Sequence, residues 1–273
     1  MSPVRIAVCQ LAPVVGDLDG NRARALAAID AAADAGARVV VLPELATSGY
    51  VFRDPAEARG LAEPSDGPTV AGWAERAAAH DVVVVGGFAE DAGGGTLHNS
   101  AAIVDASGPR AVYRKVHLWD EEPRFFTPGE APPPVVDTAH GRIATMVCYD
   151  LEFPEWVRRP ALAGADLLCV PTNWPRVDAW PDGERPMELL RAMASAATNR
   201  MAIAVCDRCG EERGVTWVSG SAIIPADGWP LAGPPAAGEP VTLLADVDLA
   251  ASRDKAVGPR NDALGDRRPA LYT

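Results

Sequence analysis

Residues 37–44, "ARVVVLPE", place four large apolar side chains in a row between an arginine and a Pro-Glu pair. A short apolar run of this kind is typical of a strand that is buried on both faces. The alanine-rich residues 20–35, which end at Gly36, indicate a helix directly before it. Residues 4–11, "VRIAVCQL", read as an earlier strand. The order strand, helix, strand predicts a parallel pair covered by a helix.

The same alternation continues along the chain. We expect further strands or hairpins at residues 82–90, 97–115, 141–148, 165–171, 202–207, 216–225 and 240–249, and further helices at residues 66–81, 154–164 and 186–201. Pro160 lies inside one of these helices and predicts a kink or a shortened helix there. Two strand-rich halves with interleaved helices predict one α/β domain over residues 1–273, with a polar, irregular tail from about residue 250.

The charge of the chain bears on its partners. The formal net charge is -12, and no clustered basic residues offer a phosphate-binding surface, so we expect no nucleic-acid partner. No apolar run approaches the length of a membrane span, and the N-terminal residues lack a signal-peptide pattern. We therefore expect a cytoplasmic protein that acts on a small-molecule substrate and does not associate with membranes.

Cysteine and lysine are both used sparingly. The odd number of cysteines and their apolar settings argue against a disulfide framework, so reduced thiols are expected at Cys9, Cys148, Cys169, Cys206 and Cys209. The C-x-x-C pair at 206 and 209 lacks other zinc ligands at suitable spacing and indicates packing, not a metal site. Among 25 basic residues only Lys115 and Lys255 are lysines, which invites a specific explanation for each.

Three reactive side chains each come just after a predicted buried strand. They are Glu44, Lys115 and Cys148, and the carboxyl ends of strands in α/β sheets are the usual location of ligand sites. Each alone has an ordinary explanation, as a loop carboxylate, a solvated cation or a thiol packed in the core. Together they predict one pocket in which a carboxylate, an ammonium group and a thiol converge.

The sequence around these residues resembles the nitrilase superfamily, the carbon-nitrogen hydrolases. The likeness rests on "PE" followed by "SGY" within residues 43–50, on "YRKVHL" and "FTPGE" within 113–130, and on "CYDLEFPE" at 148–155. It continues through residues 198–214 and 219–232 in the expected order, so it covers most of the chain. Three separated motifs in order are far more specific than any one of them.

This resemblance implies a four-layer α-β-β-α fold and a Glu-Lys-Cys catalytic set. Glu44 would be the general base, Lys115 the electrophilic stabiliser and Cys148 the nucleophile. The family's second glutamate lies four residues before the phenylalanine of an F-x-P-G segment, which is Glu122 here; Glu121 is the competing assignment. The resemblance implies no cofactor and no metal.

The chemistry asks for these residue types independently. An amide carbonyl is a poor electrophile, so its attack requires a thiolate, or a thiol that loses its proton as it attacks. Glu44 would accept that proton, give it to the leaving amine and then activate water against the thioester. Lys115 and the backbone N–H of Tyr149 would stabilise the developing oxyanion. Lys115 beside the thiol is also expected to lower the thiol pKa.

The residues after Cys148 bear on the substrate. "CYD" resembles the amidase and carbamoylase branches, whereas true nitrilases have Trp-Glu after the cysteine, so we expect amide hydrolysis that releases ammonia. If Glu152 faces the pocket, it favours a neutral or ω-amino aliphatic amide such as 5-aminopentanamide. The alternative is that Glu152 forms an internal ion pair with Arg191 or Arg200.

Other residues have weaker interpretations. Asn173 and Trp174 are predicted to contact the acyl chain from a pocket wall, with Trp180 on a flexible rim; the alternative is a surface loop that packs on another subunit. His117 is expected to make a structural hydrogen bond. Asp207 stands where many relatives have asparagine, a departure whose effect the sequence does not indicate.

Rival functions stay open at this level. N-carbamoyl amine hydrolysis and nitrile hydrolysis are the enzymatic alternatives, and a catalytically silent binding protein is the non-enzymatic one. The resemblance also implies a homodimer, or a higher homo-oligomer, in which outer helices and C-terminal tails of two subunits meet.

Overall fold

The computed structural model describes residues 2–176, 180–181, 184–236 and 238–272. One sheet has the order β13-β1-β2-β3-β4-β5. Its strands are β1 (Val4–Gln10), β2 (Val39–Val41), β3 (Val83–Asp91), β4 (Leu97–Asp105), β5 (Gly108–Arg114) and β13 (Val241–Val247). The strands β1, β2 and β3 are parallel, and the other neighbours are antiparallel.

The second sheet comes from the other half of the chain and has the order β12-β9-β8-β7-β6. Its strands are β6 (Val135–Thr138), β7 (Gly141–Thr145), β8 (Leu167–Pro171), β9 (Ala202–Cys206) and β12 (Ala222–Ile224). The central strands β7, β8 and β9 are parallel, so their carboxyl ends share one edge. The two sheets therefore repeat the parallel core that the apolar runs predicted.

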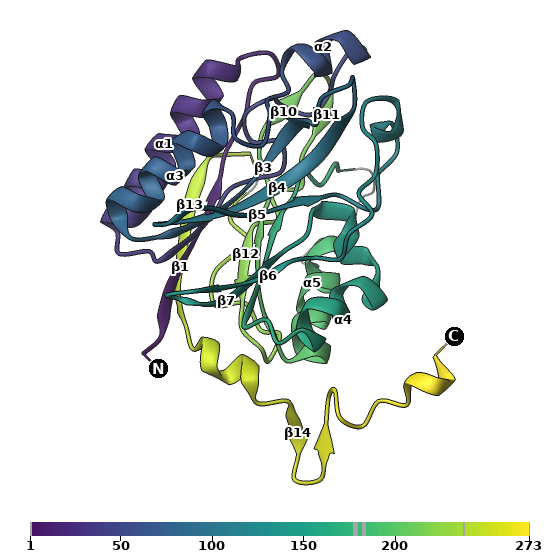
Figure 1. The fold of residues 1–273 in the computed structure, drawn as a ribbon. Coiled ribbons are helices and arrows are strands. Elements are labelled where there is room, and N and C mark those ends of the chain that lie inside the picture. Colours follow the sequence, from purple (N-terminus) through teal and green to yellow (C-terminus); the bar gives the residue numbers. More distant parts are fainter. Residues whose placement is uncertain (1, 177–179, 182–183, 237, 273) are drawn as a thin grey trace.

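Helices cover the outer face of each sheet (Figure 1). On the first sheet lie α1 (Leu18–Asp34) and α3 (Pro68–His80), which pack through Ile29 and Trp73. On the second lie α4 (Pro154–Leu162) and α5 (Met187–Asn199), which pack through Val157 and Leu189. Between the sheets, valine, isoleucine and leucine side chains form a separate buried cluster. This arrangement is the four-layer α-β-β-α sandwich, and the fold prediction is confirmed.

Several boundaries differ from the sequence-based ones. The strand predicted to end at Cys148 ends at Thr145, and Cys148 begins a 3-10 helix, Cys148–Glu152, with a left-handed φ of 47°. The helix with Pro160 continues past that proline to Leu162. Only Ala222–Ile224 of the strand predicted at 216–225 joins the large sheet; a two-residue strand, Val215–Thr216, pairs with Glu211–Glu212. The helix α2 (Pro55–Gly60) was not predicted.

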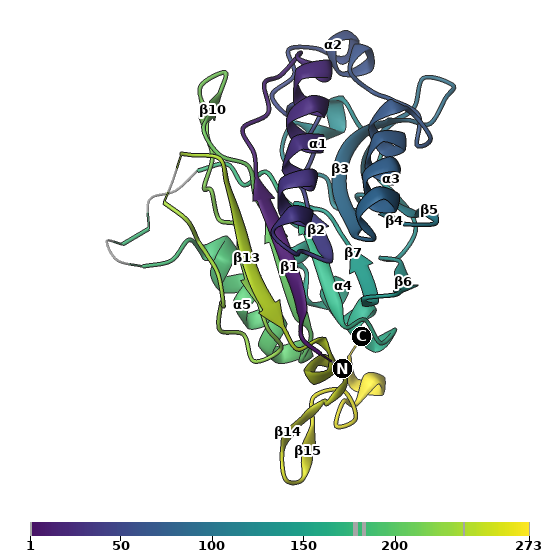
Figure 2. The ribbon, with the colours of Figure 1, turned by 90° about the vertical axis from the view of Figure 1, so that its left-hand side faces the viewer.

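The C-terminal tail leaves the body of the molecule (Figures 1 and 2). It contains a 3-10 helix (Leu249–Arg253), a small hairpin of β14 (Ala256–Gly258) and β15 (Asn261–Asp262), and a 3-10 turn (Pro269–Leu271). Its base is held by Arg253, which pairs with buried Asp166, and by Lys255, which donates to the carbonyls of Asn199 and Arg200. The second lysine thus has a structural role. Among the described residues, no helix is long and apolar enough to cross a membrane.

Candidate active site

The loops after β2, β5 and β7 bring Glu44, Lys115 and Cys148 into one buried cluster. Glu44 and Lys115 are fully buried, and Cys148 is 5% exposed. The side chain of Glu44 follows β2 after a Leu-Pro step, and Lys115 follows β5 directly. Cys148 sits on the tight turn after β7 with its left-handed backbone, a conformation that costs energy in a non-glycine residue and that clusters at functional sites. The predicted convergence of the three side chains is what the structure shows.

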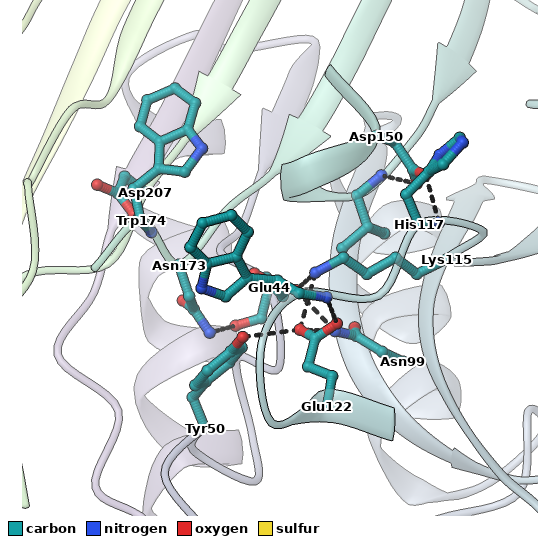
Figure 3. Close-up of polar contacts among 12 residues, drawn as sticks. Glu44, Tyr50, Asn99, Lys115, His117, Glu122, Asp150, Asn173, Trp174 and Asp207 are labelled. Carbon is teal, nitrogen blue, oxygen red and sulfur yellow. Dashed lines mark hydrogen bonds and ion pairs between the residues drawn. The ribbon is translucent and has the colours of Figure 1, made fainter. Parts of the chain in front are cut away.

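Lys115 lies between two carboxylates. Its Nζ is 2.7 Å from Oε1 of Glu44 and 2.8 Å from Oε1 of Glu122 (Figure 3). Asn99 donates to the same two oxygens, at 2.6 Å and 3.2 Å. The hydroxyl of Tyr50 donates to Oε1 of Glu122 at 2.8 Å. The network fixes the ammonium group with little freedom to move.

Between the two neighbouring glutamates, the structure selects Glu122. Glu122 is 3% exposed, and its second oxygen accepts the backbone N–H of Trp119 at 2.9 Å. Glu121 is exposed and pairs with Arg124. Glu122 is therefore the partner of Lys115, as the spacing to the F-x-P-G segment indicated; the catalytic roles of the four residues stay predictions.

Burial sets the protonation of the cluster. It raises the pKa of Glu44 to about 7, while Lys115 acts in the opposite direction. Burial disfavours the charged form of Lys115, but Glu122 and Glu44 outweigh it and hold the Lys115 pKa well above its usual range. One oxygen of Glu44, Oε2, has no hydrogen-bond partner among the described residues. Glu44 thus has both a free oxygen and a pKa suited to exchanging a proton near neutral pH.

The thiol of Cys148 is protonated at rest. Burial, followed by the nearby charge of Glu44, raises the pKa of Cys148 well above its ordinary value. Lys115 and the backbone N–H of Asn173 lower that pKa, as expected of a cation and a donor, but they do not prevail. Lys115 thus acts on the thiol pKa in the expected direction, although burial and Glu44 determine the net shift. Attack therefore requires deprotonation by a base during the reaction.

Asp150 stabilises the turn that carries Cys148. It accepts the backbone N–H of Val147 at 3.2 Å, the hydroxyl of Tyr113 at 2.7 Å and the backbone N–H of His117 at 3.0 Å. The His117 ring also contacts Asp150 at 2.7 Å, which is the structural hydrogen bond predicted for this histidine. Asp150 thus ties the turn to the loop after β5.

Asn173 bonds to the backbone of Glu44, whereas Trp174 faces a cavity. Asn173 is 1% exposed, and its side chain donates to the backbone carbonyl of Glu44 at 2.9 Å, which holds the backbone at Glu44. Trp174 lines a cavity beside Cys148. Trp180 is partly buried and packs against the hydrophobic cluster that contains Val157 and Leu189. The guanidinium group of Arg176 lies over its ring. Residues 177–179 of this loop lie outside the described residues.

Asp207 anchors the loop that holds Asn173 and Trp174. Its carboxylate accepts the backbone N–H groups of Trp174, Arg208 and Gly220 at 3.0, 2.9 and 2.8 Å. Burial raises the pKa of Asp207 to about 6, and the backbone donors oppose that shift. Sequence reasoning missed this role because two of the three donors, Trp174 and Gly220, come from loops other than that of Asp207.

The cavity beside Cys148 has a volume of about 130 Å³. Its charged residues are Glu152, Glu188 and Arg191. Glu152 lies 3.1 Å from Arg191, so it both faces the cavity and forms one of the two ion pairs considered from the sequence. Arg200 instead donates to the backbone carbonyl of Asp254. Tyr149, whose backbone N–H was predicted to bind the oxyanion, also lines this cavity.

Among the described residues, no group of three or more His, Cys, Asp or Glu side chains is arranged so that it could hold a metal ion. The thiols of Cys206 and Cys209 are buried and free, and they donate to the backbone carbonyls of Cys9 and Leu11. They pack between the strand β9 and the N-terminal strand, as the sequence indicated.

Comparisons with known proteins agree with this geometry. The sequence profile described as "Carbon-nitrogen hydrolase" matches residues 5–256. A nitrilase of Pyrococcus abyssi is 34% identical, over 98% of this chain and 99% of its own length. An N-carbamoylputrescine amidase of Solanum lycopersicum is 32% identical, over 98% of this chain and 93% of its own.

Among solved structures, an amidase from Nesterenkonia sp. superimposes with a TM-score of 0.80 at 28% identity, over 99% of this chain and 95% of the other. In another structure of that amidase, the acetamide moiety of fluoroacetamide is covalently added at the active-site cysteine. The fold, the matched profile and these relatives lead to one conclusion. The chain is a carbon-nitrogen hydrolase and belongs to the nitrilase superfamily.

Proposed function

We propose that this enzyme is a thiol amidohydrolase that converts a small aliphatic amide to its carboxylic acid and ammonia through a thioester on Cys148. The observation that carries the proposal is the buried ammonium group of Lys115, held between Glu44 and Glu122 within the same cluster as the thiol. In a glutamate-to-glutamine mutant of the Nesterenkonia amidase, the acetamide moiety of fluoroacetamide is bonded to the active-site cysteine, which supports a cysteine nucleophile.

The steps balance with the residues present. Glu44 takes the thiol proton on Oε2 as the sulfur of Cys148 attacks the amide carbon, and the carbonyl oxygen becomes an oxyanion. Lys115 and the backbone N–H of Tyr149 stabilise that oxyanion. The C–N bond then breaks, and Glu44 returns the proton to the departing nitrogen. Glu44 next deprotonates a water molecule, which opens the thioester to the acid and restores the thiol.

Glu122 and Tyr50 act on Lys115 in this scheme. Glu122 compensates the ammonium charge together with Glu44, and its other contacts, from Trp119 and Tyr50, prevent it from moving toward the substrate. Because Lys115 is buried and prearranged, the ammonium group meets the oxyanion without reorganisation. We assign Glu122 a charge-positioning role and Glu44 the proton transfer.

The cavity beside Cys148 favours a short acyl chain with a neutral or cationic end. Its volume of about 130 Å³ excludes large acyl groups. Glu152 and Glu188 outnumber Arg191 there, so the lining carries one net negative charge when all three are ionised. Burial raises the pKa of Glu152, with Arg191 acting against the shift. An ω-amino amide such as 5-aminopentanamide matches this lining, and an anionic amide does not.

N-carbamoyl amine hydrolysis is the second candidate. The acidic lining that suits an ω-amino amide equally suits the amino end of an N-carbamoyl diamine, the substrate class named for the Solanum relative. Nitrile hydrolysis and a silent binding role remain the less supported alternatives, because "CYD" and an intact Glu-Lys-Cys set do not favour them.

Ammonia release from a substrate panel decides among these functions. The panel contains 5-aminopentanamide, pentanamide, glutaramate, N-carbamoylputrescine and pentanenitrile. We expect the highest kcat/KM for 5-aminopentanamide and the lowest among the amides for glutaramate. A preference for glutaramate would overturn the charge argument. A preference for the carbamoyl compound or the nitrile would replace amide hydrolysis with one of the alternatives.

A homodimer is also proposed. Large apolar side chains are exposed on the outer helices, at Leu162, Met187 and Leu190, and on the tail, at Leu271 and Tyr272. Pairing of these surfaces between two subunits would remove them from water. Light scattering coupled to size exclusion is expected to give twice the chain mass of 28.6 kDa, and a stable monomer would contradict it.

A further inference from the structure

A second cavity lies beside the catalytic cluster, and ammonia release does not account for it. Its volume is about 240 Å³, larger than that of the cavity that contains Cys148. Trp119 and Pro175 line both cavities, so these two residues form the partition between them. Ammonia is the size of a water molecule and does not need this space. A cavity of about 150 Å³ is already enough to hold benzene.

The walls of the second cavity are aromatic and rigid. Phe52 packs edge-on against Phe125 and Phe126, with ring centroids 5.5 and 5.9 Å apart. Tyr50 packs edge-on against Trp217, with centroids 5.5 Å apart. All five rings line the cavity. Side chains held in this way form a preshaped site, which lowers the entropy cost of binding a flat ring.

The ionisable side chains that line this cavity are all acidic, but two of them are paired: Glu122 with Lys115, and Glu121 with Arg124. Asp120, Glu121 and Glu122 line it, and no lysine, arginine or histidine does so among the described residues. Aromatic faces and carboxylates both attract a cation, the first through the ring quadrupole. Asp120 and the aromatic faces therefore favour a group that combines an apolar ring with an amine, and the lining disfavours carboxylates and phosphates.

The positions of the thiol and the carboxylate decide which part of a substrate enters each cavity. After C–N cleavage the acyl group stays bonded to Cys148, so it occupies the cavity that Cys148 lines. In the proposed scheme Glu44 protonates the departing amine; Glu44 shares Lys115 and Asn99 with Glu122, and Glu122 lines the second cavity. Tyr50 connects the second cavity to the cluster around Lys115, because Tyr50 lines this cavity and its hydroxyl donates to Glu122 (Figure 3).

We propose that the aromatic cavity beside Glu122 is an amine-side subsite. It binds an aromatic ring carried by the substituent on the amide nitrogen, so that the enzyme hydrolyses secondary amides as well as primary ones. The inference rests on the proposed thioester mechanism. The balance is unchanged: the C–S bond forms, the C–N bond breaks, and the proton that Glu44 took from the thiol leaves on the arylalkylamine. Water then opens the thioester.

Three amides with related carbon skeletons test the assignment. Butyramide has no aromatic ring, N-benzylbutyramide carries the ring on the amine side, and 4-phenylbutyramide carries it on the acyl side. We expect N-benzylbutyramide to be hydrolysed to butyrate and benzylamine, and 4-phenylbutyramide to be the poorest of the three. Turnover of butyramide without any of N-benzylbutyramide would overturn the proposal and leave the amidase function intact.

Variants locate the ring. Val215 is partly exposed and lines the second cavity but not the cavity beside Cys148, so Val215→Trp fills only the second cavity. Val112→Trp is the control, because it adds the same bulk at an exposed position of β5. We expect Val215→Trp to lower the kcat/KM ratio of N-benzylbutyramide to butyramide at least tenfold, and Val112→Trp to preserve it. Phe125→Leu, which removes one aromatic wall, should lower the ratio several-fold if Val215→Trp does not fold. An unchanged ratio in the folded cavity variants would contradict the assignment.

Binding of benzylamine separates this proposal from the proposed function. Titration calorimetry with benzylamine alone requires no turnover, so it reports on the cavity even if the enzyme proves inactive on butyramide. We expect wild type and Val112→Trp to bind benzylamine with the same affinity, and Val215→Trp to bind it at least tenfold more weakly. Equal binding by all three proteins, or no binding to wild type, would overturn the subsite.

Discussion

The Nζ atom of Lys115 lies 2.7 Å from Oε1 of Glu44, and both side chains are fully buried. A fully buried ion pair is costly unless further groups satisfy it, and here Glu122 and Asn99 complete the set. The pair leaves Oε2 of Glu44 free for the thiol proton. One contact thus both places the positive charge and orients the base.

Lys115→Met should nearly abolish amide hydrolysis. It removes the charge that stabilises the oxyanion, which is expected to lower kcat by about 10²–10³-fold. It also leaves Glu44 and Glu122 buried without a cation, so the free energy of unfolding should fall by about 3–5 kcal/mol. Lys255→Met is the matched control, because that lysine only donates to backbone carbonyls at the base of the tail. Retention of wild-type kcat by Lys115→Met would rule out its assigned role.

Activity should depend on the ionisation of Glu44. Since burial raises the pKa of Glu44 to about 7, kcat/KM should fall tenfold per pH unit below that value, as the base becomes protonated. Asn99 donates to Glu44 and favours its charged form. Asn99→Ala should therefore move the acid limb of the pH profile, the fall in kcat/KM at low pH, to higher pH. Ser100→Ala, which affects a neighbouring hydroxyl bonded to Glu90, should not move it. A limb that shifts to lower pH in Asn99→Ala would refute the assignment.

The preference for a cationic acyl chain should depend on Glu152. Glu152→Gln removes one negative charge from the cavity, so the ratio of kcat/KM for 5-aminopentanamide over pentanamide should fall roughly 3- to 10-fold. Arg191→Met removes the opposing charge and should raise the same ratio. Glu155→Gln, at an exposed position in the first turn of α4, serves as the control. Identical ratios in all three variants would show that the pair does not contact the substrate.

Asp207→Asn should destabilise the loop of Trp174. The carboxylate accepts three backbone N–H groups with two oxygens, whereas an asparagine has one oxygen and would direct an NH₂ group at a donor. We expect the free energy of unfolding, measured in urea, to fall by about 1–3 kcal/mol. Asp227→Asn, an exposed aspartate that accepts the N–H of Trp229, should cost far less. Equal losses in the two variants would mean that the Asp207 contacts are not important for stability.

The sequence predicted the layers well because the buried strands form uninterrupted apolar runs. It predicted the strand after Gly141 as continuous to Cys148, since Met146 and Val147 continue the apolar pattern. The structure ends that strand at Thr145 because Asp150 and the left-handed Cys148 form a tight turn. Short or two-residue strands such as Glu211–Glu212 depend on tertiary contacts and have no local signal.

The buried cluster around Lys115 was also predictable, whereas its supporting residues were not. Glu44, Lys115, Cys148 and Glu122 occur in recognisable motifs. Asn99 lies in the middle of an ordinary strand pattern, and nothing in its neighbourhood indicates that it donates to two carboxylates. Such contacts depend on how distant strands are paired, which periodicity does not specify.

An acyl-enzyme on Cys148 is the central claim, and mass spectrometry of the intact protein tests it directly. Wild-type enzyme quenched with acid during turnover of butyramide should carry one butyryl group per chain, and peptide mapping should place it on Cys148. Cys148→Ala should show neither the adduct nor ammonia release while it unfolds at the same temperature as wild type. A folded Cys148→Ala protein that releases ammonia at the wild-type rate would contradict the account.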